Sequence, residues 1–141
     1  MSPLAVGQLG MMAHDCLADF EPTDPTAWFE RRRLSLHVAR EPQRLPGLRV
    51  CGAWDPSIGR VTLYGSGAHS DEELVRTLGH ELWHVIQHRR GNFYVDESAA
   101  EASGAAFMRW LGGGNVAGCA EALRLLADQT CDRVPRARQP F

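Results

Sequence analysis

Two histidines and a glutamate stand close together in the segment GHELWHVIQH, which runs from Gly79 to His88. His80 and His84 are four residues apart, and Glu81 directly follows the first of them. In an α-helix this spacing stacks two side chains one turn apart, so both imidazoles can reach a single metal ion. The alternative is an amphipathic helix with two surface histidines, because short patterns also recur by chance.

Start and stop signals predict a helix from about Asp71 to Arg90 around these histidines. Ser70 and Glu73 are spaced for a capping box, in which each side chain accepts a hydrogen bond from the other residue's backbone N–H. Gly91 can supply the left-handed conformation that ends a helix. Glu81 projects between the histidines and an apolar stripe for the core, which comprises Leu74, Val75, Leu78, Leu82, Val85 and Ile86.

The next segment, DESAAEASGAAF, offers a third metal ligand and is predicted to be helical from about Glu97 to Leu111. Catalytic zinc sites typically have three protein ligands. Glu97 and Glu101 lie one turn apart on the same helix face, so both are candidates. The small residues around them allow a close helix approach, although a solvated acidic face has the same pattern. His88 continues the histidine series but lies about 12 Å along the helix from His80, too far to share its ion.

Three strands are predicted before the histidine helix: Leu34–Val38, Leu48–Trp54 and Arg60–Tyr64. The segment DPSIG between the last two is a turn signal, so a small antiparallel sheet is expected. Further helices are predicted at about Leu4–Phe20, in a short segment that starts at Pro25 with Asp24 as its cap, and at about Val116–Asp128.

HELWH followed by ESAAE resembles the gluzincins, zinc metallopeptidases whose third ligand is a glutamate on the following helix. Among them, the small size and short connection resemble the ImmA/IrrE family, over about Val61 to Leu111. The resemblance implies an α+β, zincin-like fold: a small antiparallel sheet packed on the HExxH helix and a following Glu-bearing helix. It also implies one Zn²⁺ per chain on His80, His84 and Glu97, with Glu101 holding a ligand histidine's ring N–H. The reverse roles for the two glutamates stay open.

The resemblance further implies a zinc metalloendopeptidase that hydrolyses peptide or protein substrates in an extended conformation. A zinc-activated water would attack the peptide carbonyl, with Glu81 as general base. In zincins the strand before the zinc helix pairs with the substrate, which here implies Val61, Thr62, Leu63 and Tyr64. The alternatives are a non-catalytic zinc-binding regulatory or protein-interaction module with a degenerate protease fold, and a metal-free interaction protein.

An oxyanion stabiliser is not evident from the motifs. Many zincins use a tyrosine, histidine or arginine for this purpose. The candidates here are Tyr94, His69 and Arg109.

The length of 141 residues predicts a single domain, assigned to residues 1–132, with a flexible tail at 133–141. The net charge of −2 does not favour a nucleic-acid partner, and no apolar run is long enough for a membrane span. The first residues lack the pattern of a signal peptide, so a cytoplasmic location is expected. The four cysteines include no Cys-x-x-Cys pair and are expected to be free thiols, with a Cys119–Cys131 bridge as the alternative. The oligomeric state is not indicated.

Overall fold

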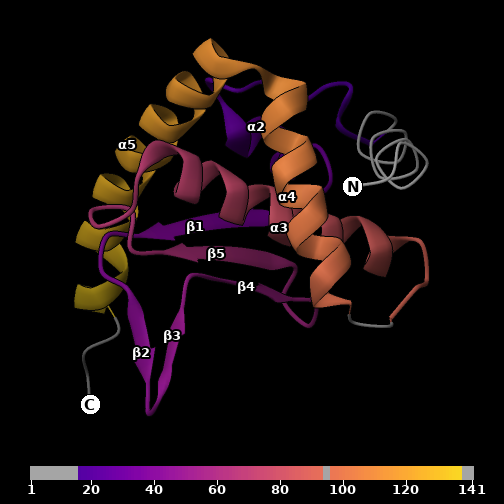
Figure 1. Ribbon diagram of the computed structural model, residues 1–141. Helices are drawn as coiled ribbons and strands as arrows, with labels where there is room; N and C mark the ends of the chain where they lie inside the picture. The colour runs from indigo at the N-terminus through magenta and orange to yellow at the C-terminus, as the bar shows by residue number, and fades with distance from the viewer. Residues whose placement is uncertain (1–15, 94–95, 138–141) are drawn as a thin grey trace.

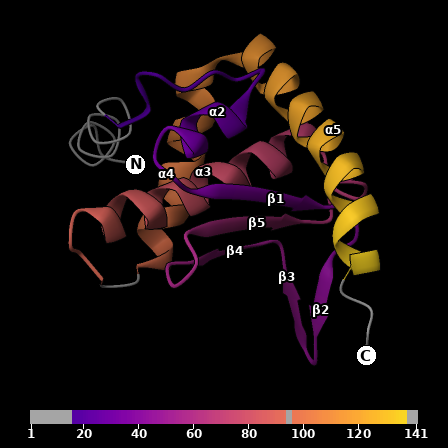
Figure 2. The same cartoon turned by 180° about the vertical axis from the view of Figure 1, so that it is seen from behind.

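The computed structural model describes residues 16–93 and 96–137, which form a mixed α+β fold (Figures 1 and 2). Its elements in chain order are α2 (Pro25–Glu30), β1 (Ser35–Ala39), β2 (Gln43–Leu45), β3 (Leu48–Val50), β4 (Gly52–Asp55), β5 (Arg60–Tyr64), α3 (Asp71–Arg89), α4 (Glu97–Leu111) and α5 (Gly113–Ala137). Most of the predicted helix Leu4–Phe20 lies outside the described residues. Within them, no helix combines the length and hydrophobicity that a bilayer crossing requires.

The main sheet has three strands in the order β1-β5-β4. β4 and β5 are antiparallel and are joined through the predicted DPSIG turn, whereas β1 runs parallel to β5. The expectation of a purely antiparallel sheet is therefore wrong. The reason is that β5 inserts between two strands that run in opposite directions, so it must be parallel to one of them.

The predicted strand Leu48–Trp54 forms two separate strands. The Pro46–Gly47 turn, with Gly47 at φ 71°, folds the chain back so that β3 pairs antiparallel with β2. β4 begins two residues after β3 and joins the main sheet instead. The β2–β3 hairpin projects away from the main sheet (Figure 1).

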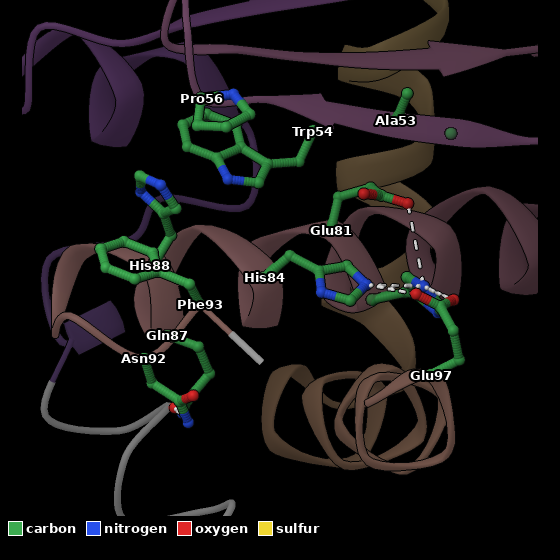
Figure 3. A pocket seen from close by; sticks show the side chains of 12 residues that line it. Ala53, Trp54, Pro56, Glu81, His84, Gln87, His88, Asn92, Phe93 and Glu97 are labelled. Carbon is green, nitrogen blue, oxygen red and sulfur yellow. Dashed lines mark hydrogen bonds and ion pairs between the residues drawn. The ribbon is translucent and has the colours of Figure 1, made fainter. Parts of the chain in front are cut away.

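The hydrophobic core lies between one face of the sheet and α3. Leu36, Val38, Val61 and Leu63 are buried on that face, and every residue of the predicted apolar stripe on α3 is also buried. α4 packs against α3, so α3 lies between the sheet and α4 (Figure 3), while α5 packs against β1 and α3. α5 extends beyond the predicted Val116–Asp128 and includes residues 133–137, which were assigned to the tail.

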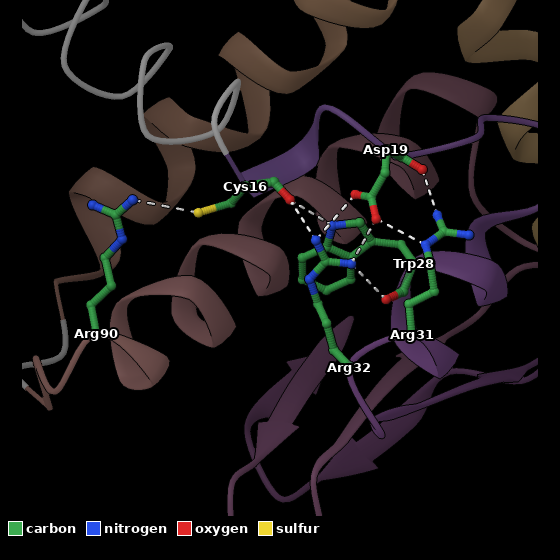
Figure 4. Close-up of polar contacts among 6 residues, drawn as sticks. All are labelled: Cys16, Asp19, Trp28, Arg31, Arg32 and Arg90. Atoms are coloured by element: carbon green, nitrogen blue, oxygen red, sulfur yellow. Dashed lines mark hydrogen bonds and ion pairs between the residues drawn. The ribbon is translucent and has the colours of Figure 1, made fainter.

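Polar contacts fasten the segment before α2 to that helix (Figure 4). Asp19 accepts hydrogen bonds from Arg31 and Arg32, and the Arg32 guanidinium lies 4.2 Å from the centre of the Trp28 ring. The Trp28 indole N–H donates to the Cys16 carbonyl at 2.8 Å. These contacts hold the segment from Cys16 to Asp19 against α2. In Figure 1, α2 lies on the β1 side of the sheet, away from the edge at β4.

Cys119 is a free, fully buried thiol, and its burial raises its pKa to about 12. Cys119 and Cys131 both belong to α5, where twelve residues correspond to about 18 Å of helix. A disulfide needs Cα atoms within about 7 Å. The alternative of a Cys119–Cys131 bridge is therefore wrong.

Candidate metal centre

α3 carries His80, Glu81 and His84, and its ends follow the local signals. The Ser70 hydroxyl accepts a hydrogen bond from the Glu73 N–H at 3.2 Å, and the Glu73 carboxylate completes the capping box. The helix ends at Arg89, with Gly91 at φ 82°. An unbroken helix across this segment places the two histidines one turn apart.

α4 brings carboxylates to these histidines. It begins at Glu97 because the Asp96 side chain caps it, accepting a hydrogen bond from the Ala99 N–H at 3.0 Å. Glu97 therefore lies in the first turn of α4, and Glu101 lies one turn further on.

Glycines allow α3 and α4 to approach closely. A Cβ atom at Gly104 of α4 would lie 2.6 Å from the Arg76 carbonyl oxygen of α3. A Cβ atom at Gly79 of α3 would lie 2.8 Å from the Cβ of Phe107. Any larger side chain at either position would push the helices apart, so these glycines set the distance between the histidines and the glutamates.

Three side chains converge on one point between the two helices (Figure 3). The Nε2 atoms of His80 and His84 are 3.3 Å apart. The two carboxylate oxygens of Glu97 lie 3.0 Å from these nitrogens, one from each. This group could hold a metal ion, because all three potential ligand atoms lie within 4.8 Å of one another. The histidines are mostly buried, whereas the Glu97 side chain is 65% exposed, so the group faces an opening.

Glu101 contacts the other nitrogen of the His80 ring. Its Oε1 atom lies 2.7 Å from Nδ1 and accepts a hydrogen bond from that N–H. With the proton on Nδ1, the Nε2 lone pair of His80 is directed toward Glu97 and is available to a cation. The structure thus places Glu97 among the potential ligand atoms and Glu101 behind the ring.

Glu81 lies between α3 and β4, beside the histidines (Figure 3). Its Oε2 atom is 3.9 Å from the Nε2 atom of His80, and its side chain is 7% exposed. Burial raises the pKa of Glu81 to about 7; His80 opposes this shift, and the charges of Glu97 and Glu101 add to it. Gly52 of β4 makes room for the carboxylate, since a Cβ atom there would lie 3.1 Å from Oε2.

Two hollows of about 570 and 470 Å³ adjoin the histidines, and both are lined by Gly52, His80, Glu81 and Glu97. Residues on either side of Gly52 extend this lining, from Val50 in one hollow to Pro56 in the other. β4 thus borders the cleft, and it is an edge strand of the sheet.

The predicted substrate strand is not at this edge. β5 lies between β1 and β4 and pairs with both, so its backbone is not available to another chain. The assignment of substrate pairing to Val61, Thr62, Leu63 and Tyr64 is therefore wrong. Ala53 and Trp54, which the sequence analysis did not single out, lie on β4 and line the cleft.

The three candidates for oxyanion stabilisation have different positions. His69 lines the smaller hollow, where its Nδ1 atom lies 3.2 Å from the Glu73 carboxylate. Arg109 lies about 18 Å along α4 from Glu97 and lines neither hollow. Tyr94 is outside the described residues.

Comparison with known proteins adds no relative: no protein-family model, curated protein or solved structure matches this chain. The interpretation of the site therefore depends on its geometry and on the chemistry of its residues. Within the described ranges, His80, His84 and Glu97 form the one group of three or more such side chains suited to a metal ion.

Proposed function

We propose that this chain is a zinc-dependent metallopeptidase of the gluzincin type with a zincin-like fold. The observation that carries the proposal is the convergence of His80, His84 and Glu97 beside the buried carboxylate of Glu81, in an open cleft. A metal site that served structure alone would not need a fourth, non-ligating carboxylate at this position.

The three side chains fit zinc in chemistry and in spacing. Two imidazoles and one carboxylate form a common ligand set of hydrolytic zinc sites. Ligand atoms at zinc-bond lengths in a tetrahedral site are about 3.3 to 3.6 Å apart. The two Nε2 atoms are 3.3 Å apart, and each lies 3.0 Å from a different oxygen of Glu97. With one oxygen from Glu97, the three ligand atoms lie within 4.8 Å of one another, so side-chain movements of about 1 Å would bring them into this range. When bound there, zinc would supply a Lewis acid that polarises a carbonyl and lowers the pKa of a water.

Glu81 would act as the proton carrier. A carboxylate acts as a base and then as an acid most effectively when its pKa is near the working pH. Burial brings the pKa of Glu81 into that range, while the nearby imidazole of His80 keeps the ionised form accessible. Glu81 would accept a proton from the attacking water and pass it to the amine that leaves the cleaved peptide bond.

The edge strand β4 would bind the substrate. An extended peptide can add to a free sheet edge through backbone hydrogen bonds. β4 borders the cleft, and Gly52 lies over Glu81, so a peptide on this edge would pass in front of the carboxylate. Because Gly52 has no side chain, the peptide could also approach β4 closely at this position.

The test is hydrolysis of an unstructured protein, such as casein, by zinc-loaded wild type beside the Glu81→Gln variant. The metallopeptidase proposal expects one zinc per chain in both proteins and cleavage by wild type alone. Glutamine keeps the shape of the side chain but cannot take up the proton. Bound zinc without cleavage by either protein would favour the non-catalytic zinc module. A folded wild type that takes up no zinc would refute both.

A further inference from the structure

One end of the cleft is lined by aromatic rings. His88 of α3 packs edge-to-face against Trp54 of β4, at a centroid distance of 5.9 Å, and against Phe93, at 4.8 Å (Figure 3). Pro56 continues this surface. Phe93 is 68% exposed, so a large apolar ring faces solvent at the mouth of the cleft. We name the surface formed by Trp54, Pro56, His88 and Phe93 the aromatic wall.

The two ends of the cleft differ in charge. Beyond the metal ligands and Glu81, the larger hollow is lined by the aromatic wall together with the amides Gln87 and Asn92. Among the described residues at this end of the cleft, His88 is the one titratable side chain. The smaller hollow has charged side chains, namely Glu73, Arg76 and Glu101. An uncharged ring would bury apolar surface at the aromatic end without the cost of desolvating a charge.

The aromatic wall lies at a defined distance from Glu81. Gly52, which lies over Glu81, and Trp54 are two residues apart on β4, a separation of about 6.8 Å. His84 and His88 are one turn apart on α3, about 6 Å along the axis. An extended peptide places side chains on the same face at the same two-residue spacing, so a peptide on β4 would have one side chain at the wall.

We propose that the aromatic wall is the specificity subsite of this enzyme and binds a phenylalanine, tyrosine or tryptophan side chain of the substrate. The bound side chain lies within two residues of the cleaved bond, as the spacing along β4 and α3 requires. This inference rests on the proposed peptidase function, since it names the substrate class of that same site. Offset or edge-to-face ring contacts and the burial of Phe93 supply the preference.

The first experiment measures the preference during turnover. Zinc-loaded wild type digests a mixture of random peptides, and mass spectrometry identifies the cleaved bonds. Aromatic residues should be enriched about tenfold or more at one position within two residues of the cut. Two peptides that differ only in having phenylalanine or alanine at this enriched position are then compared. The Phe93→Ala variant should bring the ratio of kcat/KM for the phenylalanine peptide to kcat/KM for the alanine peptide toward one. The control is Leu125→Ala, which removes an exposed apolar side chain of similar exposure from α5 and should keep the wild-type ratio.

The second experiment separates the subsite from catalysis. Calorimetric titration of the same two peptides into the zinc-loaded Glu81→Gln variant measures affinity without turnover. The phenylalanine peptide should bind about tenfold more tightly, and Phe93→Ala in that background should remove most of the difference. If the Glu81→Gln variant shows this preference but the wild type cleaves no peptide, the subsite proposal is retained and the peptidase proposal is refuted. Equal affinities, or cleavage with no aromatic preference, would overturn the subsite even if the peptidase is confirmed.

Discussion

The substitution Gly104→Ala tests whether the close contact between α3 and α4 positions the side chains of the candidate metal centre. The added Cβ atom would lie 2.6 Å from the Arg76 carbonyl oxygen, whereas ordinary contacts begin at 3.4 Å. A backbone carbonyl within a helix cannot rotate away, so the helices must move apart by about 0.8 Å, the difference between these distances. Metal–ligand distances tolerate deviations of about 0.2 Å. The movement would therefore draw Glu97 away from the histidines.

Two opposing effects determine the change in stability. Alanine is favoured over glycine in a helix by about 1 kcal/mol. Overpacking of a tight contact costs about 1–3 kcal/mol. We therefore expect the metal-free Gly104→Ala variant to be less stable than wild type by up to about 2 kcal/mol. Its zinc affinity should fall by about 10- to 100-fold, the loss typical when the support of a ligand is disturbed.

The assay combines urea unfolding in the presence of a chelator with zinc titration against a competing chromophoric chelator. Gly118→Ala is the matched control, because Gly118 lies within α5 and its Cβ atom would lie 3.6 Å from the Thr23 methyl group, which is an ordinary contact. That variant should gain about 1 kcal/mol from helix propensity and keep the wild-type zinc affinity. If Gly104→Ala gains stability like Gly118→Ala and binds zinc like wild type, the role assigned to the close contact is wrong.

Three further predictions concern individual side chains. Glu97→Ala should contain no zinc in elemental analysis and should lose the thermal stabilisation that zinc gives wild type, whereas Glu101→Ala should keep zinc with about 10- to 100-fold weaker affinity. Loss of zinc in Glu101→Ala and its retention in Glu97→Ala would exchange the roles of the two glutamates. In metal-free protein, burial raises the pKa of Glu81 from 4.5 to about 7, which disfavours the ionised form in the folded state. This penalty is absent below pH 4.5 and complete above pH 7. Glu81→Gln should therefore stabilise the metal-free protein in urea unfolding by up to about 3 kcal/mol at pH 8 and should not stabilise it at pH 4. Equal effects on stability at both pH values would contradict this prediction. Cys119 should resist alkylation in the folded protein because its thiol is buried with a pKa of about 12, and modification detected by mass spectrometry before unfolding would contradict that burial.

Features encoded by neighbouring residues were predictable from the sequence. α3 ends within one residue of its predicted bounds, and α4 matches its prediction, because caps and apolar spacing act over a few residues. The order of the strands was not predictable in this way. Arg60–Tyr64 alternates apolar and polar residues whether it lies at an edge or in the centre of a sheet. Its central place depends on pairing with β1, which is distant in sequence.

The roles of the two glutamates also required the tertiary structure. Glu97 and Glu101 share one face of α4, so helical spacing does not distinguish them. The crossing of α3 and α4 distinguishes the two glutamates, because it places Glu97 at Nε2 and Glu101 at Nδ1 of the same His80 ring. A shift of one turn in the contact between α3 and α4 would exchange these positions. The glycine pair at the contact opposes such a shift, since a residue with a Cβ atom at either place would lie within 3.0 Å of the facing helix.

The charges around His80 explain why a cation would stabilise this arrangement. Glu81, Glu97 and Glu101 all lie within 4 Å of its ring nitrogens. Their mutual repulsion contributes to the raised pKa of Glu81, together with burial. A divalent ion among the Nε2 atoms and Glu97 would offset this repulsion and favour the ionised form of Glu81, the form that accepts a proton. Under the proposed function, metal binding and activation of Glu81 would therefore be coupled, and Glu101 would support both because it contacts the His80 ring at Nδ1.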